Sequence, residues 1–180
     1  MVCLGVAAWQ AGKKVLILGA DPQGTVASWD ESREATTPEL VEVRAGESQH
    51  GVEAGKGFDF VFIDTPARAE QVNAEAARAS DFCIIPCQPS MADMRAAKPT
   101  DDALGAFGRK GAFVLTRVPS RGSRATKAVP GLGVYSWAVA PIMSGNRTDL
   151  VDAYISGRGV TEYSGEGKAA EEIRSLWQWR

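Results

Sequence analysis

Two short apolar runs, each followed by an aspartate, constrain the fold of this chain more than any other feature. The first run, Val15 to Leu18, leads to Asp21, and the second, Phe60 to Ile63, leads to Asp64. Runs that are apolar at every position are typical of strands buried on both faces of a parallel sheet. Ligands of such sheets bind beyond the carboxyl ends of the strands. Both carboxylates are therefore expected to face one crevice.

The rest of the chain alternates strand-like and helix-like segments, which predicts an α/β fold with a mostly parallel sheet flanked by helices. Further strands are expected near residues 82–86, 112–118 and 134–142, with a shorter one near 40–43. Helices are expected near residues 4–11, 68–79, 148–156 and 168–177. Residues 30–57 otherwise show little periodicity, and the glycine- and serine-containing segment around residue 122 is expected to be a flexible loop.

Composition limits the class of protein. With 180 residues and 44% hydrophobic content, residues 1–180 are expected to form a single domain. The 20 basic and 22 acidic residues balance, so net charge favours neither nucleic acid nor an acidic substrate. Cys83 and Cys87 lack further metal ligands apart from His50, which predicts buried thiols and a reduced, cytoplasmic compartment. No apolar run approaches the ~18 residues of a membrane span.

The two aspartates have two possible roles. Carboxylates at neighbouring strand ends suit Mg²⁺, which prefers oxygen ligands and is commonly shared with substrate phosphates, so phosphoryl transfer would follow. Alternatively, Asp21 and Asp64 cap the helices that follow them, as aspartate often does. Spacing alone leaves both interpretations open.

The residues around the aspartates carry a resemblance to a known family. The sequence from Val15 to Gly24 resembles the second signature of the ParA/MinD family of deviant Walker-type P-loop ATPases, and Phe58 to Pro66 resembles the family's Walker B segment. The resemblance extends over most of the chain outside residues 30–57, through residues 79–81, 84–90, 93–96, 115–117, 140–142 and 157–163.

The resemblance implies a P-loop NTPase-like fold and roles for particular residues. Asp21 would help to position the attacking water, and Asp64 would hold Mg²⁺ through water. ATP would lie near the following residues, the last three of them close to the adenine: Gln23, Thr116, Arg117 and Pro141.

Two departures from the family pattern limit this expectation. The family's phosphate-binding loop, of the form Lys-Gly-Gly-x-Gly-Lys-Thr, does not occur before Val15. The strand that leads into that loop lies inside the family's sheet, so without it the neighbouring strands would lack a ladder partner. Because Met1 falls within the expected first helix, we expect an N-terminally shortened ATPase that hydrolyses little or no ATP as given. Gly19 stands where the family more often has a further aspartate.

Basic residues gather between residues 109 and 127. They are Arg109, Lys110, Arg117, Arg121, Arg124 and Lys127. Such a group suits contacts with the phosphates of duplex DNA without sequence preference, and the last four form the candidate DNA surface. The alternative is an ordinary solvated loop.

The function expected from the resemblance is that of a ParA-type partition ATPase in plasmid or chromosome segregation. Such a protein acts as an ATP-bound homodimer on nonspecific DNA, with a ParB-like centromere-binding partner, in the nucleoid-associated cytoplasm. One alternative is a non-catalytic relative that binds DNA or a partner without turnover. Another is a MinD-like membrane-associated positioning ATPase, against which Glu171 and Glu172 argue, because a membrane-surface helix normally has a richer basic face.

Overall fold

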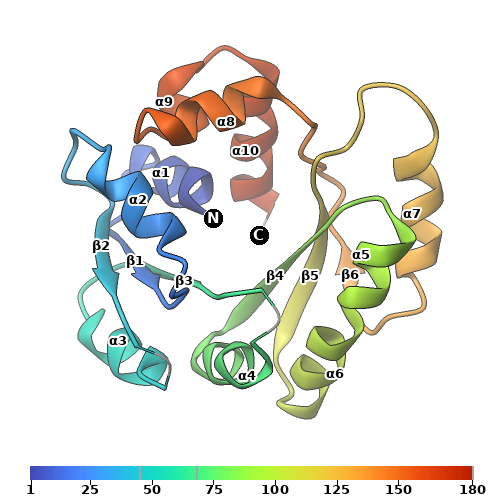
Figure 1. The fold of residues 1–180 in the computed structure, drawn as a ribbon, viewed down its shortest axis with the longest axis horizontal. Coiled ribbons are helices and arrows are strands. Elements are labelled where there is room, and N and C mark those ends of the chain that lie inside the picture. The colour runs from blue at the N-terminus through green and yellow to red at the C-terminus, as the bar shows by residue number, and fades with distance from the viewer. Residues whose placement is uncertain (45, 68, 180) are drawn as a thin grey trace.

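Two three-stranded parallel sheets form the centre of the protein, in a computed structural model that describes residues 1–44, 46–67 and 69–179 (Figure 1). The first has the order β2-β1-β3 and the second the order β4-β5-β6. The strands are β1 Val15–Gly19, β2 Glu39–Glu42, β3 Phe60–Asp64, β4 Phe82–Cys87, β5 Lys110–Leu115 and β6 Ala138–Val139. Every pairing is parallel, which confirms the α/β class predicted from the apolar runs.

Helices flank both sheets. They are α1 Val2–Gln10, α2 Thr25–Glu31, α3 Ser48–Ala54, α4 Glu70–Ala79, α5 Met91–Ala96, α6 Lys98–Ala106, α7 Arg124–Leu132, α8 Thr148–Ile155, α9 Val160–Tyr163 and α10 Lys168–Trp179. No helix in the described part of the chain combines the length and the apolar character that a membrane crossing requires.

Side chains of β1 alternate between two helical layers, as the pleat of a strand requires. Val15 and Ile17 belong to a core cluster that includes residues of α1, α9 and α10. Leu16 and Leu18 face α3, where Gly51 and Gly55 allow the helix backbone to approach closely. Because helices cover both of its faces, β1 is buried from Val15 to Leu18, as its continuous apolar run predicts.

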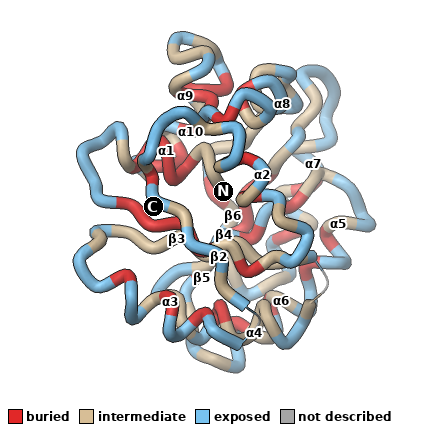
Figure 2. Tube along the Cα trace, turned by 60° about the vertical axis from the view of Figure 1, so that its left-hand side comes forward, coloured by how far each residue is buried: buried red, intermediate tan, exposed pale blue. Residues whose placement is uncertain are grey.

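The same helical layer serves both sheets. Val114 of β5 and Ala140, just after β6, lie in one core cluster with Val15 and Ile17 of β1. Phe113 and Leu115 point to the opposite face of β5, into a second cluster formed with α5, α6 and α7. Figure 2 shows the buried residues in red along the central strands and the inner sides of the helices.

The break between the sheets falls between β3 and β4, each of which is the last strand of its sheet. Their sequences are as apolar as those of interior strands, yet β3 is only half-buried throughout, and Phe82 and Ile84 of β4 are 41% and 37% exposed. Among the described residues, β3 and β4 thus each lack a ladder partner on one side, as the sequence led us to expect.

Local elements differ from the sequence prediction in three places. Residues 124–132 form α7, not part of a flexible loop, and residues 48–54 of the weakly periodic segment form α3. The expected strand over residues 134–142 contracts to two residues, Ala138 and Val139. The interior Pro130 of α7 concealed that helix, because proline normally ends one.

Candidate functional site

Asp21 and Asp64 lie at the same edge of the first sheet. Gly19, the last residue of β1, is the ladder partner of Asp64, the last residue of β3. The N–H of Ala20 donates to the C=O of Asp64 at 2.9 Å, and Asp21 follows directly. The prediction that parallel strands would bring the two carboxylates to one edge is therefore confirmed.

Neither aspartate caps a helix. The N-cap of α2 is Gly24, in the left-handed conformation with φ +66°, and the N-cap of α4 is Ala69. The carboxylate of Asp21 instead accepts the N–H of Gln23 at 2.9 Å and holds the turn that follows β1. The capping interpretation is therefore wrong.

Asp64 has an unusual electrostatic environment. Burial raises its pKa above the ordinary aspartate value, the α-amino group of Met1 opposes the rise, and the negative charge of Asp21 adds to it. These influences place Met1, the N-cap of α1, in one neighbourhood with both carboxylates. A half-buried carboxylate with a like charge beside it is a site where a divalent cation would relieve an unfavourable interaction.

The described residues offer ligands for the metal of a Mg²⁺–nucleotide but not for its triphosphate. Asp21 and Asp64 supply the hard oxygen atoms that Mg²⁺ prefers, and two carboxylates are enough when phosphates and waters complete the shell. No group of three or more His, Cys, Asp or Glu residues in the described part of the chain could hold a metal alone. The triphosphate is not matched, because residues 1–14 contain no glycine-rich loop with Lys and Thr.

The segments predicted to lie near adenine meet at the carboxyl edge of the second sheet. Val118 N–H donates to Ser144 C=O at 3.1 Å, and Asn146 N–H donates to Val118 C=O at 2.8 Å. Thr116 and Arg117 come directly before Val118, and Pro141 lies three residues before Ser144.

Arg117 is exposed and has φ +49°, the only described non-glycine residue with a positive φ. Such a backbone conformation at the end of a strand is uncommon for arginine and recurs at ligand-binding positions.

A salt bridge that the sequence did not reveal holds the segment of residues 144–147 in place. Glu172 of α10 pairs with Arg147 and accepts the N–H of Gly145 at 2.9 Å. Asn146 and Arg147 line a surface depression of about 470 Å³ that also includes Ser120 and Lys168. Because 25 residues separate Arg147 from Glu172, no local pattern could have predicted the pair.

The candidate DNA surface is exposed. Arg117 and Arg121 lie in the segment after β5, whereas Arg124 and Lys127 lie three residues apart on α7 and thus share a face. None of the four forms an ion pair with another described residue. Arg109 and Lys110, by contrast, are at the opposite end of β5, so the sequence cluster divides into two groups.

The cysteines are free thiols. Cys87 is buried, and burial together with the charge of Asp93 raises its pKa to about 11. The prediction of a buried thiol is confirmed for Cys87, whereas Cys83 is half-buried.

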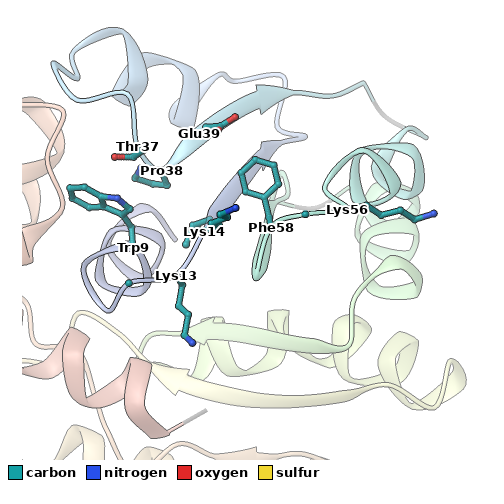
Figure 3. Close-up of a pocket in the computed structure, with 11 residues that line it drawn as sticks. Trp9, Lys13, Lys14, Thr37, Pro38, Glu39, Lys56 and Phe58 are labelled. Atoms are coloured by element: carbon teal, nitrogen blue, oxygen red, sulfur yellow. The ribbon is translucent and has the colours of Figure 1, made fainter.

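A second pocket, of about 500 Å³, lies at the amino ends of the first sheet's strands, away from both aspartates (Figure 3). Trp9, Pro38 and Phe58 face one another around it, whereas Lys13 and Lys56 extend away from it. Without converging polar groups it has little to orient a ligand.

Comparison with known proteins finds similarity in structure alone. No protein-family model matches the chain, and no curated protein matches it. A MinD septum site-determining protein from Pyrococcus horikoshii, complexed with Mg-ADP, has a TM-score of 0.76 and 17% identity, over 98% of this chain and 86% of that one. A ParA-family ATPase from Chlorobium tepidum has a TM-score of 0.70 and 12% identity, over 98% and 91%. An ATP complex of a McdA variant from Cyanothece has a TM-score of 0.66 and 16% identity, over 99% and 90%. The chain thus has the P-loop NTPase-like fold of the ParA/MinD proteins.

Proposed function

We propose that this protein is a positioning ATPase of the ParA/MinD type, in its partition branch, and that residues 1–180 carry its metal-binding, base-binding and DNA-binding parts. The observation that carries the proposal is the ladder pairing of Gly19 with Asp64, which brings Asp21 and Asp64 to one edge. The fold shared with nucleotide complexes of MinD and McdA supports it.

Mg²⁺–ATP would occupy the carboxyl edge of the two sheets. Asp64 would hold the metal through water, and Asp21 would orient a water molecule beside it. Gln23 lies in the turn after β1, and Thr116, Arg117 and Pro141 would surround the adenine. When bound, Mg²⁺–ATP would supply a terminal phosphoryl group that the metal polarises for attack by water.

For residues 1–180 the proposal covers binding and not turnover. Phosphoryl transfer depends on backbone N–H groups and cationic side chains around the phosphates. Residues 1–14 contain only Lys13 and Lys14 as basic side chains, and both lie beyond the carboxyl end of α1. The carboxylates alone cannot stabilise a developing phosphate charge.

The partition role adds DNA, a protein partner and a second copy. Arg117, Arg121, Arg124 and Lys127 are exposed, without described ion-pair partners, and would contact DNA phosphates irrespective of sequence. The protein would act as a homodimer in the nucleoid-associated cytoplasm, and a ParB-like protein would be its partner.

A second candidate is a non-catalytic protein that binds DNA without nucleotide. The exposed basic residues, together with the absence of a phosphate loop before Val15, favour it. A MinD-like membrane role has less support, because Ile173, Leu176 and Trp177 of α10 are buried in the core.

Two titrations separate the candidates. Binding of ATP is followed by calorimetry with and without Mg²⁺, and binding of duplex DNA by fluorescence anisotropy with and without Mg²⁺–ATP. The positioning ATPase requires Mg²⁺-dependent ATP binding that Asp64→Asn abolishes. DNA binding of the same strength with and without ATP, in a protein that does not bind ATP, would instead establish the non-catalytic protein.

A further inference from the structure

Tyr154 of α8 contacts the first turn of α2. Its hydroxyl donates a hydrogen bond to Thr25 C=O at 2.7 Å, across 129 residues of sequence. Thr25 is the first residue of α2 and directly follows the N-cap Gly24. The ring of Tyr154 packs against the core cluster that contains Val26, so the bond costs less side-chain freedom than one from a fully exposed side chain. A contact from α8 therefore reaches the end of α2 that adjoins the Asp21 turn.

The turn between β1 and α2 is short and carries its own hydrogen bonds. Gly24 N–H donates to Asp21 C=O, and Gln23 N–H donates to the Asp21 carboxylate, both at 2.9 Å. The direction of this carboxylate thus depends on where Gln23 lies, and Gln23 is two residues before Thr25. A displacement of the first residues of α2 would therefore move the donor that holds the Asp21 side chain.

Other long-range hydrogen bonds hold α2 at its far end. Trp29, which is fully buried, donates its indole N–H to Arg158 C=O at 3.1 Å. Arg33, two residues after the helix, donates to Gly157 C=O at 2.8 Å and pairs with Glu162. Because these bonds lie in the second half of α2 and beyond it, they do not fix its first turn.

We propose that Tyr154 is a positioning residue for the metal-binding edge: its hydroxyl fixes the first turn of α2 and so holds the Asp21 carboxylate at the edge that it shares with Asp64. The start of the turn is fixed by the sheet, because Ala20 N–H donates to Asp64 C=O at 2.9 Å. Residues that hold the side chains of a metal site in place contribute to metal affinity, and their loss commonly costs about tenfold or more. The consequence for nucleotide binding rests on the proposed function, whereas the position of the carboxylate does not.

Tyr154→Phe tests the proposal, because it removes the hydroxyl and keeps the packed ring. The first measurement is the exchange of the Gln23 amide proton with water, followed by NMR on the isotope-labelled protein without nucleotide. We expect this exchange to become about fivefold faster, which is the factor expected for the loss of one hydrogen bond of ordinary net strength. Exchange at Gln23 that stays at the wild-type rate would overturn the proposal.

Two controls separate positioning from a general loss of stability. Ser156→Ala, at the C-cap of α8, removes a hydrogen bond to Ala153 C=O that does not reach α2, so exchange at Gln23 should stay unchanged. Glu162→Gln should lower the unfolding midpoint more than Tyr154→Phe does, yet accelerate exchange at Gln23 less, because an exposed turn exchanges through local opening. Equal acceleration in Ser156→Ala, or acceleration that follows the loss of stability across the variants, would overturn the proposal.

The second measurement is the dissociation constant of Mg²⁺–ATP, obtained by calorimetry. Tyr154→Phe should weaken binding by about fivefold or more, and Ser156→Ala should leave it unchanged. If the wild type binds Mg²⁺–ATP and Tyr154→Phe binds it as tightly, the proposal is overturned even where exchange at Gln23 has changed. If the wild type itself binds no ATP, the proposed function fails, and exchange at Gln23 then decides alone whether Tyr154 positions Asp21.

Discussion

Burial raises the pKa of Asp64 at the carboxyl edge of the first sheet, and the negative charge of Asp21 raises it further. The ladder pairing of Gly19 with Asp64 enforces this proximity, because it aligns the ends of β1 and β3. Two carboxylates held together in this way disfavour their own ionisation until a cation joins them.

Asp21→Asn should lower the pKa of Asp64, because it removes the like charge. Burial would still hold that pKa above the ordinary value. Carboxyl carbon chemical shifts followed through a pH titration measure the change. Asp59→Asn is the control, since Asp59 lies at the other end of β3, where it accepts the Lys14 N–H at 2.8 Å. An equal shift in both variants would show that the interaction is not local.

Asp64→Asn should stabilise the metal-free protein at neutral pH. Folded Asp64 binds its proton more tightly than the unfolded chain does, so its contribution to stability is present below pH ~3.8 and is lost as the pH rises through its raised folded pKa. Asparagine avoids this loss. Urea denaturation at pH 7 and pH 3 should show a gain for the variant only at pH 7; a loss at pH 7 would mean that the ionised carboxylate is stabilised in the fold.

Glu162→Gln should destabilise the protein by about 3 kcal/mol at pH 7, because it leaves a buried arginine without its charge partner. The side chain of Arg33 is 2% exposed and pairs with Glu162 at 2.8 Å. The exposed pair of Lys98 and Asp102 gives the matched control, for which Asp102→Asn should have a much smaller effect, because solvent screens the exposed charges.

The Glu162 effect should also depend on pH. Burial raises the pKa of Glu162, but hydrogen bonds from Arg33 and the Gly159 N–H and the charges of Arg33 and Arg158 outweigh it, so the pKa is lowered overall. The pair therefore stabilises the fold above pH ~4.5, and this contribution is lost as the pH falls through the lowered folded pKa. A difference between wild type and variant that persists at pH 2 would contradict the ionic explanation.

Gly157→Ala should destabilise the fold by more than about 1 kcal/mol. Gly157 ends the α8 turn with φ +63°, and an added Cβ would lie 2.3 Å from the backbone of Ser32. Gly105→Ala in α6, where nothing lies within 4 Å of the added Cβ, should instead stabilise by about 0.5–1 kcal/mol. Thermal unfolding of the two variants should move the midpoint in opposite directions.

The double variant Arg124→Gln, Lys127→Gln should weaken binding to duplex DNA of any sequence. Loss of two phosphate contacts should reduce the slope of log affinity against log salt by about 2. Lys13→Gln, Lys56→Gln removes two cations near the pocket of Figure 3 and serves as the charge-matched control. Equal losses in the two double variants would show that net charge, and not the α7 surface, attracts DNA.

Much of the fold follows from local sequence. The run from Val15 to Leu18 predicted an interior strand, because a strand covered on both faces needs apolar residues at every position. The apolar pattern of β3 and β4 is typical of interior strands, yet among the described residues both lie at sheet edges, as expected where the neighbouring strand of the family pattern is not among residues 1–180.

The candidate site was predicted only in part. Strand ends revealed Asp21 and Asp64, and the resemblance supplied roles for Thr116, Arg117 and Pro141. The pairing of Glu172 with Arg147, which fixes the neighbouring segment, joins residues far apart in the chain and left no local signal. The separation of Arg109 from Arg124 also needed the structure, because β5 carries them to opposite ends.

The most direct test of the central claim is a titration of the wild-type protein with ATP, with and without Mg²⁺, while the Asp64 carboxyl signal is observed by NMR. The account predicts ATP binding that needs Mg²⁺, perturbs the Asp64 signal, is lost in Asp64→Asn and is unchanged in Asp59→Asn. ATP binding that is independent of Mg²⁺, or that survives Asp64→Asn, would contradict a metal–nucleotide site at the ends of β1 and β3.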